Sequence, residues 1–359
     1  MFRLGYSMVQ WGLVGVLVAG ALSGCHVSVR KNVKDLTAEE KQEFVDAILA
    51  LKDTPSPYDD TLSYYDQFVK WHHEVNNCLG YHYHGRPQFF PWHRIMLLQF
   101  EAAMEEVTGK HIAIPYWDWS DPESTAAVFS DDFMGGTGDP ANNYAVMTGP
   151  FRRDNFTVEV FNPRDPQQLT YVARNIGSAY MPNLPTAEQI DAGFDIGTYD
   201  AAPWSVETDP TESFRNYVEG WRNVTSNVCD EQGNMIIQSQ AAMHNQVHRY
   251  VGGAWQTETG FGGGTMLLTT SPADPVFFVH HAFVDHLWDQ WSAIYGEIYL
   301  SDPDGHAGHD MDAKCADHHG DQDPGLHEVL WPFTKEIIGR DWMPCDLLNS
   351  QKIGVRYED

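Results

Sequence analysis

Residues 65–101 read YDQFVKWHHEVNNCLGYHYHGRPQFFPWHRIMLLQFE, and this stretch decides the fold. It carries histidines on both sides of a Gly-Arg-Pro turn, within segments whose apolar residues follow the helical period. A second group of histidines lies in MHNQVHRY (residues 243–250) and DPVFFVHHAFVD (residues 274–285). Because helix bundles commonly build metal sites from inward-facing side chains, the two groups predict two three-histidine sites held by helices.

The spacing within the second group is typical of a metal chelate. His244 and His248 stand four residues apart without an intervening Gly or Pro, so on a helix both rings project from one face. Zinc hydrolases use the related HExxH pattern with Glu as the general base, but here Asn245 follows the first histidine. An isolated HxxxH is more often structural, so the metal interpretation depends on both groups occurring together. All-imidazole sites without a hard oxygen ligand favour copper over zinc, although ligand softness alone does not decide between them.

At these residues the chain resembles the tyrosinase family of binuclear copper proteins, which includes tyrosinases, catechol oxidases and molluscan haemocyanins. His84-Gly-Arg-Pro-Gln-Phe-Phe-Pro-Trp-His-Arg and Glu101 resemble the first copper signature, and Asp274-Pro-Val-Phe-Phe with Asp285 resembles the second. The resemblance extends from VRKNVKDLTAEEK near residue 30 to the closing GVRYED. Two features depart from the family. Val355 replaces a frequent Tyr, and His82 stands where fungal and molluscan members carry the Cys of a Cys-x-His thioether.

The resemblance implies one ligand set for each copper ion. His72, His84 and His93 would hold the first copper, and His73 competes with His72 because the two are adjacent. The set expected to hold the second copper is His244, His248 and His281. Of the adjacent His280 and His281, the second is chosen because it lies four residues before Asp285. His280 is then expected to be a packing residue or a support for the ligands.

The family relationship further implies oxidation of phenols by O2, which the two coppers bind between them. The segment SFRNYVEGWRN resembles the one whose glutamate, together with an asparagine after the first ligand of the second copper, orients a water that deprotonates a monophenol. The corresponding residues here are Glu219 and Asn245, although the placement of Glu219 crosses an insertion that follows Trp221. Since imidazoles bind metal only when deprotonated, acid should inactivate the protein.

Three further residues are candidates for substrate binding. Arg249, next to His248, is suited to a substrate carboxylate such as that of tyrosine, and the alternative is a solvated helix residue. The loop GTMLLTTSPADP lacks the Phe that covers the entrance in many plant diphenolases, so Met266 or Leu267 is expected to line an open pocket.

The chain has 359 residues, 42% of them hydrophobic, and this length and composition fit one large domain. The pattern predicts a mainly α fold, in which a four-helix-bundle core holds the binuclear site and long loops and few short strands complete the domain. The expected helices are Ala38 to Lys52, Asp60 to Glu74, Trp92 to Val107, Ser239 to Val251 and Pro275 to Tyr295.

The first residues predict export. Arg3, an apolar run and Leu22-Ser23-Gly24-Cys25 resemble a bacterial lipoprotein signal over residues 1–24, with lipid on Cys25 and the catalytic domain in residues 25–359. An ordinary secretory signal or a short anchor is the alternative. The expected location is therefore the periplasm or the cell surface, attached to the membrane. In that oxidising compartment the remaining cysteines predict two disulfides with three connectivities, among Cys78, Cys229, Cys315 and Cys345.

The net charge of −28 argues against nucleic acid as a partner. The polar segment from Asp302 to His327 contains histidines that could collect copper, but such inserts are more often surface loops. A copper-delivery partner is a further expectation. The alternatives to a tyrosinase are a catechol oxidase with diphenolase activity only, a dioxygen carrier, a copper-storage lipoprotein and a zinc hydrolase.

Overall fold

The computed structural model describes residues 27–76, 83–161, 168–229, 235–257, 260–300 and 326–358, without the side chains of residues 223–229, 235–239 and 261. The predicted signal with Cys25, Cys78, His82 and the histidine-containing segment up to residue 325 lie outside this part of the chain. Predictions about them are therefore untested by the fold.

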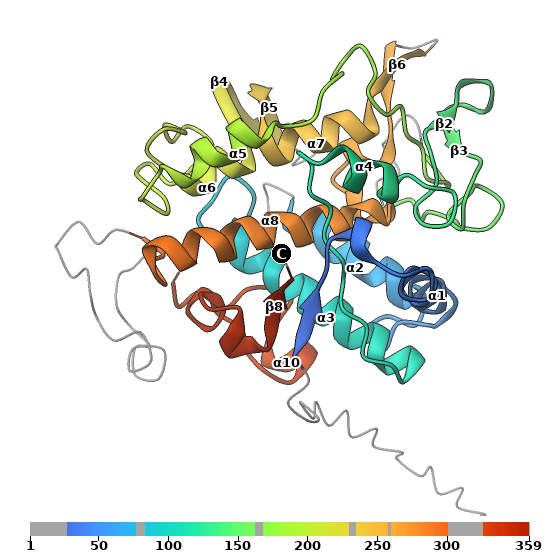
Figure 1. Ribbon diagram of the computed structural model, residues 1–359, viewed down its shortest axis with the longest axis horizontal. Helices are drawn as coiled ribbons and strands as arrows, with labels where there is room; N and C mark the ends of the chain where they lie inside the picture. Colours follow the sequence, from blue (N-terminus) through green and yellow to red (C-terminus); the bar gives the residue numbers. More distant parts are fainter. Residues whose placement is uncertain are drawn as a thin grey trace, which may run out of the picture.

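Four helices form the centre of the molecule. They are α2 (Tyr64–Val75), α3 (Phe89–Thr108), α7 (Met243–Gly252) and α8 (Val276–Tyr295). In Figure 1, α8 crosses the middle of the molecule between α7 on one side and α3 on the other. Helix α8 is buried at every residue from Val276 to Trp288, in keeping with its predominantly apolar sequence. The prediction of a mainly helical fold around a bundle core is confirmed.

Local sequence signals explain where these helices begin. The Ser63 side chain accepts a hydrogen bond from the backbone N–H of Asp66 and caps α2, so this helix starts at Tyr64 instead of the expected Asp60. Helix α3 starts at Phe89, three residues before the prediction, because Pro91 lies in its first turn, where a missing N–H breaks no helical hydrogen bond. Helix α8 starts after Asp274, whose carboxylate accepts the N–H of Val276 at 3.1 Å.

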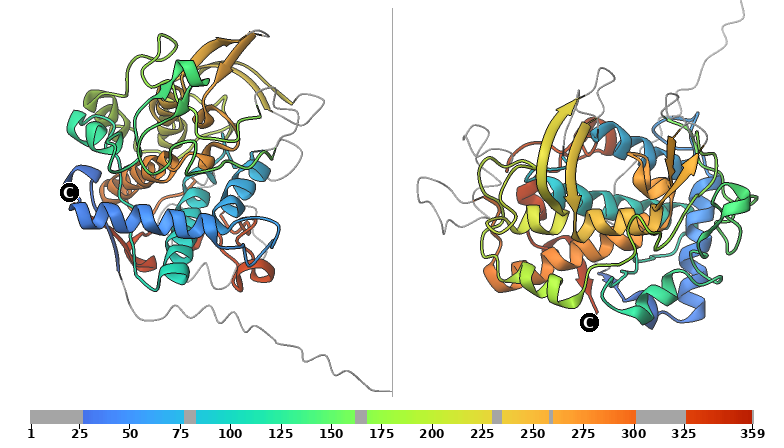
Figure 2. Two further views of the ribbon diagram at one scale, coloured as in Figure 1. Left: turned by 90° about the vertical axis from the view of Figure 1, so that its right-hand side faces the viewer. Right: turned by 90° about the horizontal axis from the view of Figure 1, so that it is seen from above.

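The expected start of α7 at Ser239 is wrong. The insertion before it forms an antiparallel hairpin of β4 (Trp221–Cys229) and β5 (Met235–Ala241), so the chain is extended until Ala241. Figure 2 shows this hairpin extending away from the helical core. Residues 240 and 241 pair with Arg222 and Trp221 through backbone groups, and this pairing overrides the helical tendency of residues 239–241.

The two ends of the domain are joined by a parallel pair of β1 (Ser28–Arg30) and β8 (Val355–Tyr357), in which Ser28 lies opposite Val355. Helix α1 (Ala38–Asp53), predicted for Ala38 to Lys52, packs against α2 and α3. Long loops and short elements complete the domain, as predicted. The short elements are α4 (Pro122–Val128), β2 (Gly138–Asp139), β3 (Ala145–Val146), α5 (Ala187–Phe194), α6 (Phe214–Glu219), β6 (Ala254–Thr257), β7 (Gly260–Gly263), α10 (Lys335–Ile338) and the 3-10 helices η1 (Val33–Asp35), η2 (Pro140–Asn142), η3 (Thr265–Leu267), η4 (Ser271–Ala273), η5 (Pro344–Leu347) and η6 (Gln351–Ile353). Within the described ranges, no helix has the length and apolar character needed to cross a membrane.

Candidate metal centre

The first histidine group comes from two core helices and the loop between them. His72 lies near the end of α2, His93 lies in the first turns of α3, and His84 lies in the connecting loop. All three are buried, and each offers a ring nitrogen within 4.8 Å of those of the other two. The sequence prediction thus names three residues that the fold brings together.

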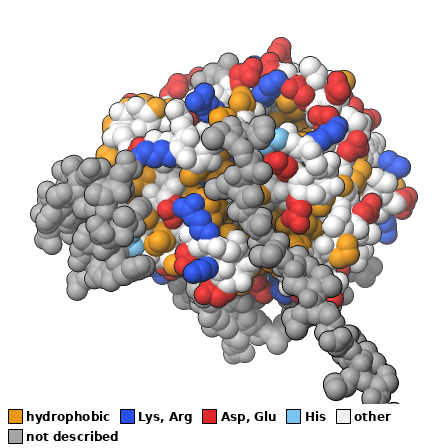
Figure 3. Space-filling view, turned by 90° about the horizontal axis from the view of Figure 1, so that it is seen from below, with side chains coloured by type: hydrophobic (Ala, Val, Ile, Leu, Met, Phe, Trp, Pro, Cys, Tyr) orange, Lys and Arg blue, Asp and Glu red, His pale blue; other side chains and the backbone are white. Residues whose placement is uncertain are grey.

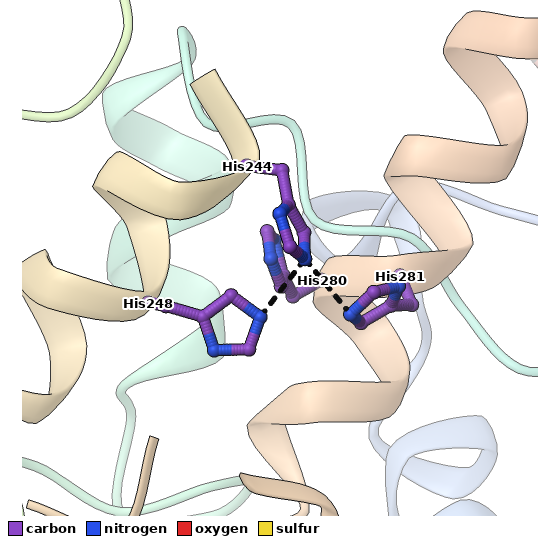
Figure 4. A group of neighbouring side chains, drawn as sticks. All are labelled: His244, His248, His280 and His281. Atoms are coloured by element: carbon purple, nitrogen blue, oxygen red, sulfur yellow. Dashed lines mark hydrogen bonds between the residues drawn. The ribbon is translucent and has the colours of Figure 1, made fainter. Parts of the chain in front are cut away.

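The second group contains four histidines. His244 and His248 face inward from α7, and His280 and His281 come from α8; their ring nitrogens also lie within 4.8 Å of one another. Figure 4 shows His244, His248 and His281 pointing toward a common centre. The Nε2 atom of His244 lies 3.0 Å from that of His248 and 3.2 Å from that of His281.

The two groups form one continuous centre. The rings of His93 and His281 stack with centroids 4.1 Å apart and planes at 11°. Phe89 packs against both groups, with its centroid 4.8 Å from that of His93 and 5.0 Å from that of His244. Two metal ions held by these groups would therefore be neighbours.

Backbone carbonyl groups fix the orientation of four of the rings. A carbonyl oxygen can only accept a hydrogen bond, so the Nδ1 atom that contacts it must carry the proton. The pairs are His72 with Thr269 at 2.7 Å, His93 with Phe89 at 2.7 Å, His244 with Glu219 at 3.2 Å and His248 with Met266 at 2.8 Å. In each neutral ring the Nε2 atom is then a bare lone pair.

These lone pairs are what a metal ion requires. The Nε2 atoms of His72 and His93 are buried and have no hydrogen-bond partner among the described residues. The lone pairs of His244 and His248 face each other across 3.0 Å, an arrangement that is repulsive unless a cation lies beside them. The residues present therefore fit a metal ion in each group, and the all-imidazole donor set suits copper.

Burial keeps these histidines neutral. It lowers the pKa of His93 from 6.5 to about 3 and that of His248 to about 4. Burial also lowers the pKa values of His72, His244 and His281 well below the usual range, and neighbouring histidines add to the effect. Neutral imidazoles are the form that binds a metal, so the site is prepared for it near neutral pH.

His73, the competing candidate to His72, and His280, the expected packing residue, have distinct surroundings. His73 turns its Nδ1 atom to the Thr269 hydroxyl at 2.7 Å and is absent from the cluster formed by its neighbour His72. His280 is fully buried, and its ring stacks on that of His244 with centroids 5.0 Å apart and planes at 12°. Both nitrogens of His280 lack a hydrogen-bond partner within the described structure, and it lies in the four-histidine cluster.

A cavity of about 280 Å³ opens onto both histidine groups. Of the residues predicted to act on substrate, four line it: Asn245, Arg249, Met266 and Leu267. The amide Nδ2 of Asn245 is buried and has no partner among the described residues. Arg249 makes no salt bridge within the described structure, and its guanidinium lies 5.9 Å from the ring centroid of the exposed Tyr180.

Glu219 is fully buried beside the cavity and does not line it. Its Oε1 accepts the backbone N–H of Gly85 at 2.5 Å, and its Oε2 accepts from Arg215 at 3.1 Å. Burial raises its pKa from 4.5 to about 6, while Arg215 and the Gly85 N–H act in the opposite direction.

Several groups of the centre were missed from the sequence. Asn76, Trp221 and Thr269 line the cavity, and the carbonyl groups of Met266 and Thr269 each orient one histidine. Backbone carbonyls exist at every position, so no sequence signal could have identified these two. For Asn76, which directly follows α2, its place four residues after His72 was an available signal.

Two other predictions concern the periphery. Cys345 is disulfide-bonded, as expected, whereas the pairing among the four cysteines remains a prediction. On the face drawn in Figure 3, lysine and arginine side chains are scattered among acidic ones without forming a continuous basic stripe.

Comparison with known proteins assigns this centre to a known type. The family model described as the common central domain of tyrosinase matches residues 62–294. The chain is 37% identical over 278 residues to the tyrosinase of Streptomyces glaucescens, covering 76% of this chain and 86% of that protein. It is 38% identical over 266 residues to the tyrosinase of Streptomyces lincolnensis, covering 74% and 82%.

Solved structures show the same fold at lower identity. A polyphenol oxidase variant from Thermothelomyces thermophila superposes with a TM-score of 0.61 at 20% identity, covering 92% of this chain and 88% of that one. Deoxygenated hemocyanin from Rapana thomasiana gives a TM-score of 0.56 at 19% identity, covering 94% and 70%. These two likenesses concern the fold alone.

Proposed function

Because the chain belongs to the tyrosinase family of type 3 copper proteins, we propose that it hydroxylates monophenols at the ortho position and oxidises o-diphenols to o-quinones. It is a tyrosinase-type oxidoreductase. The observation that carries the proposal is the convergence of buried imidazole lone pairs from two groups on one cavity. When bound, two copper ions supply the activation of O2 and the redox capacity that this chemistry requires.

In this proposal His72, His84 and His93 hold the first copper, and His244, His248 and His281 hold the second. His73 takes no part as a ligand in this proposal; the support is that its Nδ1 atom faces the Thr269 hydroxyl and that it lies outside the cluster. His280 supports the second site by stacking on His244. The carbonyl groups of Phe89, Glu219, Met266 and Thr269 hold four of the ligand rings in the orientation that presents Nε2.

Asn245 and Glu219 take up the phenolic proton through a water molecule. The unpaired amide of Asn245 at the cavity wall offers a donor for that water, and a carboxylate with a pKa of about 6 is a suitable base near neutral pH. The O–H bond of the phenol breaks, and its proton passes through the water to Glu219. An o-diphenol needs less help because its hydroxyl groups are more acidic and its oxidation inserts no oxygen, so this pair matters most for monophenols.

The cavity mouth selects the substrate. Arg249 has no carboxylate partner within the described structure and lines the cavity, so it binds the carboxylate of an amino-acid phenol. Met266 and Leu267 form the apolar wall against which the aromatic ring lies. Both roles concern binding and leave the redox step to the metal centre.

The test is oxygen uptake by the copper-loaded protein with L-tyrosine and L-DOPA in parallel. Uptake with both substrates, lost in His93→Ala, would support a tyrosinase. Uptake with L-DOPA alone would identify a catechol oxidase and contradict the role given to Glu219 and Asn245. No uptake despite two bound coppers would contradict the proposal and favour a dioxygen carrier, as the fold shared with a hemocyanin allows.

We also propose that residues 1–24 direct export and that Cys25 carries a lipid anchor, which would place the enzyme at the membrane surface in the periplasm or outside the cell. The support is the Leu-Ser-Gly-Cys sequence after an apolar run. Mass spectrometry of the N-terminal peptide would detect the acyl groups. Cys25→Ala should move the protein from the membrane to the soluble fraction, and an unmodified Cys25 in the mature protein would contradict the anchor. Delivery of copper by a partner protein stays a separate hypothesis.

A further inference from the structure

Three buried ionic side chains form a chain that ends at Glu219. Arg215 donates to both oxygens of Asp200, from Nε at 3.0 Å and from one terminal nitrogen at 3.1 Å. Its other terminal nitrogen donates to Glu219 at 3.1 Å and to Asn216 at 3.2 Å. Asp200, Arg215 and Glu219 are all 0% exposed. An arginine held by a bidentate pair has a fixed direction, so the group it contacts next is fixed as well.

Asp200 is itself held firmly. Its Oδ1 accepts from the Ser213 hydroxyl at 2.7 Å and from the backbone N–H of Ala201 at 2.9 Å. Arg215 uses its remaining donor on the carbonyl of Ser205 at 3.0 Å. The series of interacting side chains Asp200, Arg215 and Glu219 is therefore anchored at Asp200, the end that lies away from the metal centre.

From this anchored position Glu219 contacts the loop that carries His84 and one histidine of the second group. Its carboxylate accepts the N–H of Gly85, the residue after His84, at 2.5 Å. Its backbone carbonyl accepts from Nδ1 of His244 at 3.2 Å. The carboxylate thus lies between the loop of the first group and the first ligand of the second group, next to the cavity wall formed by Asn245.

We propose that Arg215, held by Asp200, is a positioning residue for monophenol hydroxylation, because it aims the Glu219 carboxylate toward the water shared with Asn245. This inference rests on the proposed function of Glu219. Arg215 touches neither substrate nor metal; it acts through the carboxylate. A shift of that carboxylate by a fraction of an ångström lengthens the hydrogen bond to the water, and proton uptake from a monophenol depends on that bond.

A merely structural role would give a different result. Loss of a buried ion pair lowers stability, and it would lower activity on both substrate classes together. A positioning role lowers the ratio of monophenol to diphenol activity, since diphenol oxidation depends less on Glu219. The ratio is therefore the informative quantity, and copper content and thermal stability are measured beside it.

The experiment compares Arg215→Lys, Asp200→Asn, Glu219→Gln and the double variant Arg215→Lys/Glu219→Gln. Lysine keeps the charge but cannot bind Asp200 in bidentate fashion while reaching Glu219. Asp200→Asn weakens the anchor without changing either of the other two residues, and it serves if Arg215→Lys does not fold. Arg222→Lys is the matched control, because the Arg222 guanidinium donates to the backbone carbonyls of Asn216, Tyr217 and Trp221 and packs on the Tyr217 ring, and it forms no hydrogen bond with Glu219 within the described structure.

With L-tyrosine and L-DOPA, we expect Arg215→Lys and Asp200→Asn to lower the ratio of the two kcat/KM values about 10-fold or more, on the scale of general-base contributions. The ratio of Arg222→Lys should equal that of the wild type. In the Glu219→Gln background, Arg215→Lys should lower the ratio no further, because both changes remove the same function.

Two outcomes would overturn the inference and are distinguishable from each other. A low ratio in Glu219→Gln with wild-type ratios in Arg215→Lys and Asp200→Asn would leave the proposed function intact and make Arg215 purely structural. A wild-type ratio in Glu219→Gln would refute the role of Glu219 itself, and the role of Arg215 with it.

Discussion

Arg94 and Asp285 connect two of the four histidine-bearing core helices, α3 and α8, through a buried ion pair, in which Arg94 Nε lies 2.5 Å from Asp285 Oδ1. Arg94 follows His93, and Asp285 lies one helical turn after His281. The same aspartate accepts from Arg30 of β1 at 2.9 Å and from the Tyr357 hydroxyl of β8. One carboxylate thus joins α3 and α8, each of which carries histidines of the centre, to both ends of the domain.

Asp285→Asn should destabilise the protein strongly. The change leaves the buried guanidinium groups of Arg94 and Arg30 without a shared anion, and breaking such a pair costs about 3–5 kcal/mol. Denaturant unfolding of the metal-free protein measures this loss. The matched control is Asp289→Asn, one turn later on α8, where the half-buried carboxylate accepts from Ser350; we expect a loss below about 1.5 kcal/mol there. Equal losses in the two variants would contradict a special role for Asp285.

The metal-free protein should lose stability as the pH falls from about 6.5 to 4. In the unfolded chain the histidines titrate near 6.5, whereas the folded state keeps His248 neutral down to about 4 and His93 down to about 3. The unfolded state therefore binds more protons in this window, and the free energy of unfolding falls. For His248 alone the loss is about 3 kcal/mol, because each unit of pKa difference corresponds to about 1.4 kcal/mol.

Glu219 acts in the opposite direction, since its raised pKa favours the folded state as the pH falls below about 6. It is one group against several histidines, so the net effect remains destabilising. Denaturant unfolding at pH 7.5, 6 and 4.5 without metal tests this. A free energy of unfolding that stays constant across the window would show that the histidines are not held neutral by the fold. Copper loading should raise the stability at pH 7.5, because the metal binds the folded state.

The core helices and the grouping of the histidines could be predicted because helical periodicity and residue spacing are local patterns, whereas the choice of ligands within each group came from the family resemblance. The four-residue spacing of His244 and His248 and the DPVFF start of α8 each specify a face or a boundary within one segment. The hairpin before α7 and the buried ionic interactions of Asp200, Arg215 and Glu219 were not predictable in this way. They depend on pairing between backbone groups and on contacts between residues such as Gly85 and Glu219, which are 134 positions apart.

His280 and His281 should differ sharply in copper binding although they are adjacent. Phenylalanine at either position keeps an aromatic ring in the core but removes both nitrogens. His281→Phe should bind one copper per chain, because it loses an Nε2 atom from the convergent centre of the second group. His280→Phe should retain two, since its stacking contact with His244 persists. Elemental analysis after dialysis gives the stoichiometry. One copper in His280→Phe would make His280 a ligand and require a different second site.

Arg249→Gln should weaken the binding of phenols that carry a carboxylate. The guanidinium lines the cavity without a salt bridge in the described structure, so a substrate carboxylate gains a charge-assisted hydrogen bond there. We expect the KM for L-tyrosine to rise about 5- to 30-fold, in line with about 1–2 kcal/mol for such a bond at a partly exposed site. The KM for tyramine, which has an ammonium group and no carboxylate, should stay the same or fall, and kcat should change little for either substrate. Arg356→Gln is the matched control, because it removes the same charge from an exposed position on β8. If Arg249→Gln raises the KM values for L-tyrosine and tyramine equally, Arg249 shapes the cavity mouth without recognising the carboxylate.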